Sequence, residues 1–408
     1  MEAFKRKPTI SETELLRQFK KNISDVLTPL HTDAYLMKWI RAGNFNIRKS
    51  EQFFREALAT RALYSIDSFA DHGKEPKVAE DFGFAVPIGF AKDGTPVTYA
   101  AFGRGDLYGF VASLSSYDLC LYGSYWFEKD LKRAREQSKR LGKEINQVTY
   151  IVDMEDFSLA RAARTCVIES SFDLLRLMQD IYPELGKNMF VVNAAFYFYQ
   201  AFNVLKPVFR KSFLKDVYVV SKEDTPALLL KYIDADVLPA FLGGNRVDSK
   251  GDPFCREFMK FGGPIPTDYH LSRLPPLLPS DPGVESVYIP ARGVYNHSLI
   301  VRAPKSRLHI EMRAEGGSVS TAILFREFGS DPNHPDIPPS DVYLDENNEE
   351  CNVRLISPCV KLQLHISPAD LHCNLPWAGI YIFRFDNSCN WVSGRNLILR
   401  LQIIAPNS

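Results

Sequence analysis

Hydrophobic residues follow two different patterns in this chain, and the change between them comes at one segment. Residues 261–284 hold six prolines and three glycines, too many for a packed helix or strand. Before this segment short apolar runs alternate with long helical patterns, whereas after it only short runs separated by polar turns occur. We therefore expect a multidomain chain in which residues 263–284 link an α/β part to an antiparallel β-sandwich.

Three amphipathic helical patterns occupy the start of the chain. Ser11 and Glu14 form a capping box in front of the first apolar stripe. Thr32 can cap a second helix, and Gly43 stands where a left-handed residue is expected to end it. Together with a third pattern that follows, these helices predict a small helical module over residues 7–75.

The middle of the chain alternates strand and helix patterns. Four short runs rich in β-branched and aromatic residues predict strands at 96–102, 148–152, 189–192 and 217–220. Helical patterns lie between them, at about 107–140 and 160–182. Such alternation predicts an α/β domain over residues 76–262, with its sheet covered on at least one face.

Beyond the linker, residues 285–406 are predicted to form the sandwich. Its strands are indicated by short and mostly alternating runs at 299–301, 307–312, 319–325, 360–366, 379–385 and 397–404. The segment 329–350 is rich in Asp, Pro and Asn, and we expect it to be a mobile surface loop.

The balance of charge excludes some partners. Lys and Arg number 49 and Asp and Glu number 49, so no long-range field favours nucleic acid, and any membrane contact must be local and largely apolar. The basic run 129–143 is interleaved with Asp130 and Glu136, which favours a solvated helix face over an anionic-lipid patch. No apolar run is long enough to span a bilayer, and the N-terminus lacks a secretory signal, so a cytoplasmic location is expected.

The sequence contains no recognisable motif for enzyme chemistry or for metal binding. The seven cysteines include no Cys-x-x-Cys pair, and four of them lie near His365 and His372 without the spacing of a zinc site. Asp153 and Glu155 end a predicted strand without a convergent histidine, so we expect them to cap the next helix or bind backbone amides. Neither Gly-x-Ser-x-Gly nor His-Glu-x-x-His occurs. We therefore expect no catalytic residue, no metal and no cofactor.

Residues 189–209, MFVVNAAFYFYQAFNVLKPVF, carry the most informative pattern. A buried strand is predicted to end at Asn193, after which aromatic and aliphatic residues surround most of a helix. Such a helix needs apolar partners on more than one side. It is either a central helix buried by its neighbours, or a cover with core beneath it and a ligand or membrane above it.

At this point the chain resembles the CRAL-TRIO lipid-transfer family over almost its entire length. The matching stretches follow one another in the family's order: YLMKWIRA at 35–42, IVDME at 151–155, YPE at 182–184, FVVNA at 190–194, LKP at 205–207, and the closing turn at 238–239 and 243–244. GIYIFRFDN at 379–387 resembles a GOLD domain, which implies a GOLD-like sandwich.

The resemblance implies a soluble lipid-binding or lipid-transfer protein that encloses one hydrophobic ligand behind a mobile gate helix and exchanges it at membranes. The implied ligand-binding residues are Tyr99, Phe102, Tyr150, Ile151, Val152, Met178, Phe190, Val192, Phe196, Phe198, Phe202 and Leu205. The implied gate residues are Ala195, Tyr197, Phe202 and Phe209. Glu184 is the implied contact for a polar headgroup.

Departures from the family pattern narrow the expected ligand. Gly43 and Asn44 stand where phosphoinositide-holding members carry an Arg-Lys pair, and Asp216 stands where they carry a Lys. The hydroxyl pair that holds a choline-lipid phosphate falls on Val148 and Tyr150. A tocopherol, retinoid or other isoprenoid is therefore expected ahead of a phospholipid.

Two functions besides the carrier stay open. As a carrier, the chain has a lipid ligand and a transient membrane surface as partners. The first alternative is a non-catalytic adaptor in membrane trafficking that binds a protein partner through the GOLD-like domain. A regulator that hands its lipid to a metabolic enzyme combines both. An identified lipid bound to the purified protein would favour the carrier.

Overall fold

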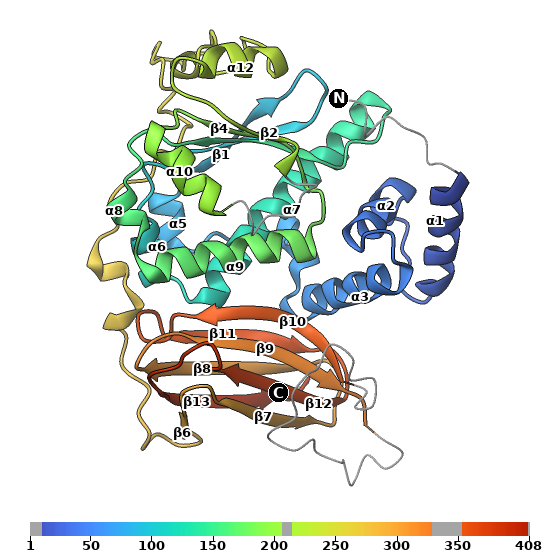
Figure 1. The fold of residues 1–408 in the computed structure, drawn as a ribbon, viewed down its shortest axis with the longest axis vertical. Helices are drawn as coiled ribbons and strands as arrows, with labels where there is room; N and C mark the ends of the chain where they lie inside the picture. Colours follow the sequence, from blue (N-terminus) through green and yellow to red (C-terminus); the bar gives the residue numbers. More distant parts are fainter. Residues whose placement is uncertain (1–9, 206–213, 329–352, 407–408) are drawn as a thin grey trace.

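The computed structural model describes residues 10–205, 214–328 and 353–406. Figure 1 shows a group of N-terminal helices beside an α/β domain, with a β-sandwich below both. The predicted fold class is confirmed: a helical module, an α/β domain and an antiparallel sandwich follow one another along the chain.

The N-terminal module consists of α1 (Ile10–Asn22), α2 (Asp33–Ala42) and α3 (Ile47–Tyr64). Its core is built by rings that meet edge to face, with Phe54 lying 5.9 Å from Phe19 and 5.3 Å from Trp39 between centroids.

The residues at the two ends of α2 explain where this helix begins and ends. The Thr32 hydroxyl accepts the N–H of Tyr35 at 3.2 Å, so the predicted N-cap is confirmed. The prediction that Gly43 adopts a left-handed conformation is wrong, because its φ is −76° and the left-handed residues are Asn44 and Phe45. Glycine is needed at 43 for space, since a Cβ there would lie 2.2 Å from the Ser50 hydroxyl.

In the described part of the chain, the central sheet has five strands in the order β1-β2-β3-β4-β5. They are β1 (Ala85–Phe90), β2 (Pro96–Ala100), β3 (Val148–Asp153), β4 (Gly186–Val192) and β5 (Val217–Val219). β1 is antiparallel to β2, and the other neighbours are parallel. The sequence analysis missed β1, whose register shifts between Pro87 and Gly89, the two residue types that weaken a strand pattern most.

Helices and short 3₁₀ turns precede, connect and follow these strands. The helices are α4 (Phe69–His72), α5 (Lys77–Phe82), α6 (Leu107–Ser113), α7 (Ser116–Leu141), α8 (Leu159–Ala162), α9 (Thr165–Ile181), α10 (Phe196–Leu205) and α12 (Thr225–Tyr232). The 3₁₀ turns are Ile66–Ser68, Ala240–Leu242, Thr267–Tyr269 and Leu271–Arg273. The pattern at 107–140 is two helices, because Ser115 accepts the N–H of Asp118 and caps α7.

Side chains alternate between the two faces of the sheet. On one face, here called the α7–α10 face, Val148 and Tyr150 pack against side chains of α7 and α9, and Val152 packs with those of α10. On the other, the α12 face, Ile151 packs with α12 and with the chain at 238–261. Neighbouring residues of one strand therefore serve different layers of the domain.

Within residues 285–328 and 353–406, eight strands form the sandwich: β6 (Glu285–Ile289), β7 (Val294–Val301), β8 (Ser306–Glu315), β9 (Val319–Arg326), β10 (Val353–Leu362), β11 (Ala369–Leu375), β12 (Gly379–Asp386) and β13 (Arg395–Ile404). Two antiparallel sheets have the orders β10-β9-β12-β7 and β11-β8-β13-β6. β6 and β11 were not predicted, and the run expected at 360–366 leaves its strand at Leu362. The loop predicted at 329–350 lies outside the described residues.

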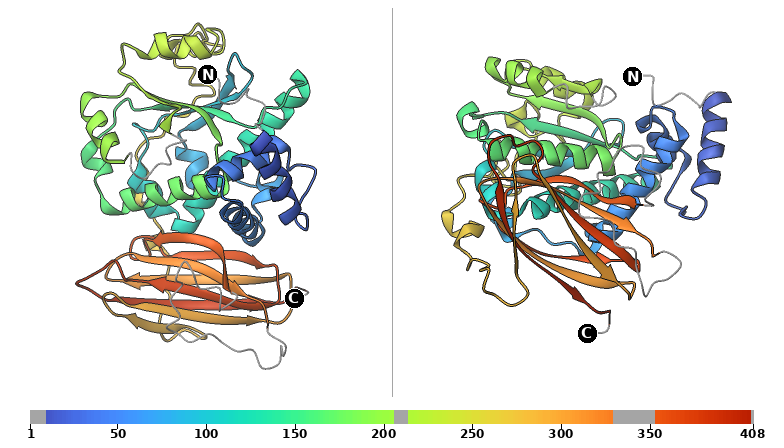
Figure 2. Two further views of the ribbon diagram at one scale, coloured as in Figure 1. Left: turned by 45° about the vertical axis from the view of Figure 1, so that its right-hand side comes forward. Right: turned by 60° about the horizontal axis from the view of Figure 1, so that its bottom comes forward.

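The sandwich is fastened to the helices by a continuous core. One buried apolar cluster contains Leu63 of α3 and Tyr117 of α7 together with Leu371 of the sandwich. The Thr60 hydroxyl donates to the carbonyl of Ile356 at 3.0 Å, inside this contact. The two further views in Figure 2 show the sandwich against the same side of the helices. The contact therefore fixes the sandwich relative to the α/β domain.

Candidate functional site

Helix α10 begins just after β4 ends, over the carboxyl-terminal ends of the parallel strands, as Figure 1 shows. Its Phe198 is buried, packs edge to face on Phe157 at 5.5 Å between centroids, and stacks with Phe202 at 6.2 Å. Phe196 is 80% exposed and Tyr197 is 41% exposed. The helix therefore has core on one side and aromatic side chains in solvent on the other.

The structure brings four of the predicted ligand-binding residues together. Phe102, Val152, Phe198 and Phe202 share one apolar cluster on the α7–α10 face. Tyr150 is on the same face, two residues before Val152, and packs toward α7 and α9. Phe102 and Val152 therefore lie beneath the α10 side chains Phe198 and Phe202, and Tyr150 extends the same face toward α9.

Four other predicted residues lie on the opposite face of the sheet. Tyr99, Ile151, Phe190 and Val192 are fully buried on the α12 face. Phe190 lies 4.9 Å from the ring of Tyr232 in α12. Period-two alternation along each strand is the signal that separates these residues from those beneath α10.

The remaining predicted residues are scattered. Met178 is buried in α9, Phe196 is exposed at the start of α10, and Ala195, just before α10, is partly buried. The backbone of Leu205 ends α10, and Phe209 lies outside the described residues.

Asp153 is held by hydrogen bonds at the end of β3. Its carboxylate accepts from the Tyr99 hydroxyl at 2.6 Å, from the Asn193 amide at 2.7 Å and from the backbone N–H of Glu155 at 2.9 Å. Burial and the neighbouring Asp153 charge raise the pKa of Tyr99 above its ordinary value. The group joins the turn before α10 to the sheet.

A buried polar group on α7 was missed by the sequence analysis. Asp130 was expected on a solvated helix face, but it is buried and accepts from the Thr98 hydroxyl at 2.7 Å and from Arg133 at 3.0 Å. Burial first, and then the Asp130 carboxylate, raise the pKa of Tyr150 well above its ordinary value. The burial of Asp130 could not be predicted, because the neighbouring residues in the sequence are mostly basic. The contact with Thr98 on β2 becomes visible in the folded structure.

Glu184 is engaged by the N-terminal module. Its two carboxylate oxygens accept from Arg41 Nε and Nη2 at 2.9 Å and 2.7 Å. Such a bidentate pair holds the carboxylate in place. Contact with a polar headgroup through Glu184 would require this pair to open.

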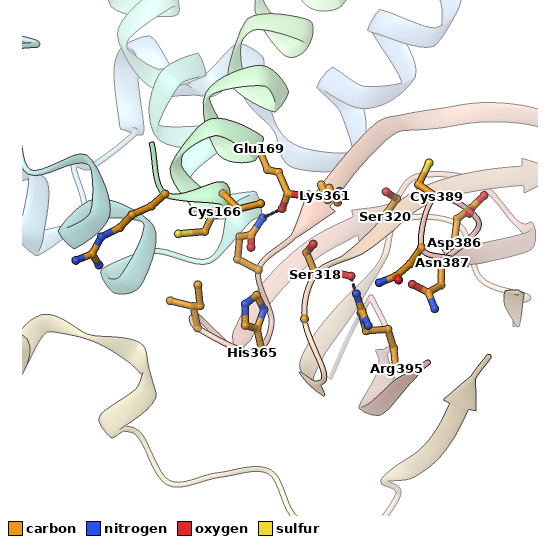
Figure 3. Close-up of a pocket in the computed structure, with 16 residues that line it drawn as sticks. Cys166, Glu169, Ser318, Ser320, Lys361, His365, Asp386, Asn387, Cys389 and Arg395 are labelled. Atoms are coloured by element: carbon orange, nitrogen blue, oxygen red, sulfur yellow. Dashed lines mark hydrogen bonds and ion pairs between the residues drawn. The ribbon is translucent and has the colours of Figure 1, made fainter. Parts of the chain in front are cut away.

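A separate cavity of about 590 Å³ lies between the start of α9 and one end of the sandwich (Figure 3). Most of the residues that line it are of polar types, and they include Arg164, Glu169, Lys361 and His365. Lys361 Nζ lies 2.6 Å from a Glu169 carboxylate oxygen across the boundary between the two domains. This cavity was not predicted, because it is formed by segments about 200 residues apart in the chain.

Two kinds of feature are absent from the described ranges 10–205, 214–328 and 353–406. They contain no cluster of three or more His, Cys, Asp or Glu side chains placed to hold a metal ion. They also contain no helix that is long and apolar enough to cross a bilayer.

Comparisons with known proteins agree with the geometry. The model of the CRAL/TRIO domain matches residues 81–244. Protein ctg-1 of Caenorhabditis elegans is 21% identical over 399 residues, which cover 97% of this chain and 98% of that protein. The crystal structure of Sfh5 aligns with a TM-score of 0.50 and 18% identity, covering 62% of this chain and 92% of that one, which shows a shared fold.

The matched segment spans the central sheet, α9 and α10, and the sandwich behind it fits the expected GOLD-like domain. Proteins of this family are lipid-binding and lipid-transfer proteins. Residues 81–244 therefore form a CRAL/TRIO domain.

Proposed function

We propose that the chain carries one hydrophobic lipid between the α7–α10 face of the sheet and helix α10, and that α10 is the gate through which the lipid enters and leaves at a membrane. The observation that carries this proposal is the division of the α10 aromatics. Phe198 and Phe202 lie on the apolar cluster of the sheet, while Phe196 and Tyr197 are exposed to water.

A carrier must offer its lipid an environment as apolar as the bilayer. Each buried CH₂ is worth roughly 0.8 kcal/mol, so a tail of about sixteen carbons resists leaving a membrane by on the order of 10 kcal/mol. An open and empty binding face would expose a large apolar patch. A gate that opens only in contact with lipid avoids this exposure, and the exposed aromatics of α10 supply that contact.

The polar groups near the proposed binding face favour a weakly polar lipid. Tyr150 offers a neutral hydroxyl there, since its pKa is raised by burial. Two cations of the surrounding helices already have acidic partners, because Arg133 pairs with Asp130 and Arg41 pairs with Glu184. A phosphorylated headgroup needs cationic donors of its own, whereas a tocopherol, retinoid or other isoprenoid presents one hydroxyl or carbonyl group.

The direct test is to identify the lipid that accompanies the purified protein, by native mass spectrometry and by solvent extraction. We expect one weakly polar lipid per chain. In the variant Phe202→Asp, a charge replaces an aromatic side chain of the binding face, and the bound lipid should be lost.

A matched control is Phe45→Asp in the N-terminal module. Phe45 is exposed and left-handed, with a φ of 61°, a conformation that Asp tolerates, so this variant should keep its lipid. Unchanged lipid content in Phe202→Asp would remove the gate assignment. A wild-type protein without any lipid would favour the adaptor hypothesis.

A further inference from the structure

Exposed apolar side chains occur at two places, one on the α/β domain and one on the sandwich. On the α/β domain they are Leu159 of α8 and the two α10 residues Phe196 and Tyr197. On the sandwich they are Trp391, 72% exposed, and Val392, 92% exposed, in the turn between β12 and β13. An exposed Trp-Val pair at the tip of a turn is costly to keep in water, which points to a contact surface.

The turn that carries Trp391 is ordered by its own hydrogen bonds. The buried Asn387 amide donates to the carbonyls of Pro290 at 2.9 Å and Ser393 at 3.1 Å. The N–H of Arg292 donates to the carbonyl of Asn390 at 2.9 Å. The Trp391 indole is therefore exposed to solvent on a turn whose backbone is held by hydrogen bonds.

Chain segments that adjoin the two apolar places line the same interdomain cavity. The lining of this cavity includes Cys166 at the start of α9 and Cys389 in the β12–β13 turn, and both are labelled in Figure 3. On the other side, the Tyr197 hydroxyl donates to the carbonyl of Phe157, so α10 is tied to the segment that leads into α8 and α9. Because the sandwich is fastened by a buried core, these positions are fixed relative to one another.

Cationic side chains surround the same two places. Arg161 and Arg164 are exposed beside Leu159, and Arg292 is exposed beside Trp391. The guanidinium of Arg164 lies over the ring of Tyr108, and that of Arg292 lies 4.4 Å from the Trp391 ring. None of these three arginines makes an ion pair with a carboxylate in the part of the chain that the structure describes.

The nearby acids are already engaged. Asp156 pairs with Arg104 at 3.0 Å, and Asp386 pairs with Arg384 at 3.2 Å. Glu169 is paired with Lys361 within the cavity. The surface thus combines apolar anchors with arginines whose charge is available, which is complementary to a bilayer that contains anionic phospholipid.

We propose that the β12–β13 turn is a second membrane anchor, in which Trp391 and Val392 enter the interfacial layer of an anionic bilayer on the same side as α10. Arg161, Arg164 and Arg292 contact lipid phosphates around these anchors. The inference rests on the proposed exchange of lipid at membranes. It gives the sandwich a role in that exchange, because the anchored β12–β13 turn would hold helix α10 against the bilayer.

Tryptophan fluorescence reports this anchor directly. The chain has four tryptophans, and of these only Trp391 is exposed, since Trp39 is buried and Trp126 and Trp377 are partly buried. Vesicles of equal parts phosphatidylserine and brominated phosphatidylcholine should quench the emission of the wild-type chain. Trp391→Phe should lose most of that quenching while it still binds the vesicles.

A second measurement is vesicle flotation of the double variant Trp391→Ala/Val392→Asp. Its binding to the phosphatidylserine vesicles should fall by about tenfold or more, because two interfacial side chains are lost. The matched control is Ile403→Asp, at the opposite end of the same sandwich and 39% exposed, which should bind as the wild type does. Vesicles of phosphatidylcholine alone should bind the wild type more weakly.

Lipid content, measured by native mass spectrometry, separates this inference from the carrier function. Loss of vesicle binding in the double variant with its lipid content intact supports the second anchor. Unchanged vesicle binding in that variant overturns it, whatever the lipid content of Phe202→Asp. Wild-type chain that binds vesicles without quenching also overturns it, and leaves the turn as a contact for a protein.

Discussion

Helix α10 and the sandwich are both attached to the α/β domain through aromatic side chains, yet the two attachments differ in what else holds them. Phe198 and Phe202 of α10 pack on the sheet, with other aromatics of the helix left in water. At the sandwich, Tyr64 and Tyr117 are buried, and the Gln363 N–H donates to the Ser116 hydroxyl at 3.0 Å within the contact. Apolar packing is non-directional, whereas buried hydrogen bonds specify one geometry. The comparison indicates that the attachment of α10 can open, whereas the attachment of the sandwich stays closed.

The largest effect is expected at the closed attachment. Tyr117→Ala removes a buried ring that lies 6.1 Å from that of Tyr64, and should lower the free energy of unfolding by about 3–5 kcal/mol. Urea unfolding measures this loss. Labelling of the Cys373 thiol gives a second measurement, because burial raises its pKa to about 12 and keeps it unreactive until the contact opens. A loss below about 1 kcal/mol would mean that the sandwich is loosely attached.

A smaller effect, with a defined pH dependence, is expected at Asp173 in the same attachment. Its carboxylate accepts the Lys361 N–H at 2.6 Å, and burial raises its pKa from 3.8 to about 6. Because the folded pKa is the higher one, the stability that Asp173 contributes is fully present below pH 3.8 and is lost as the pH rises through about 6.

Asp173→Asn keeps an acceptor oxygen and removes the buried charge. Above about pH 7 this variant should therefore be more stable than the wild type by about 1–3 kcal/mol, and the fall in stability between about pH 4 and pH 6 should flatten. Urea midpoints at several pH values would test both expectations. A variant less stable than the wild type at neutral pH would show that the ionised carboxylate strengthens the contact.

The smallest effect on stability is expected at α10. Phe198→Ala removes a side chain nearly as large as that of Tyr117. Helix α10 can move toward the sheet and fill part of the space, so the free energy of unfolding should fall by about 1–2 kcal/mol. The lipid content should fall at the same time. Thermal unfolding together with solvent extraction would measure the two effects. A cost equal to that of Tyr117→Ala would make α10 part of the core.

Most of the fold could be predicted from residue periodicity. The helical module and the change from α/β to sandwich follow from patterns that repeat over many residues, such as the strand at 148–152 between two long helical stretches. Strand β1 was missed because Pro87 and Gly89 interrupt its pattern. Strand β6 was missed because it follows directly on the linker and contains a single buried residue, Ile289.

The site was predicted less completely, because a strand places adjacent residues on opposite faces. Ile151 and Val152 looked equivalent as apolar neighbours, yet one packs under α12 and the other under α10. The interdomain cavity and the burial of Asp130 depend on tertiary contacts that no local pattern encodes.

The core shared by Leu63, Tyr117 and Leu371 also bears on what a proteolytic cut would do. A protease acting on the exposed linker near Leu274 would break one peptide bond without exposing that core. The nicked halves should therefore stay together through gel filtration and separate only in denaturant. Covalent continuity across the linker is then dispensable once folding is complete, and the chain behaves as one cooperative unit despite its two unlike architectures.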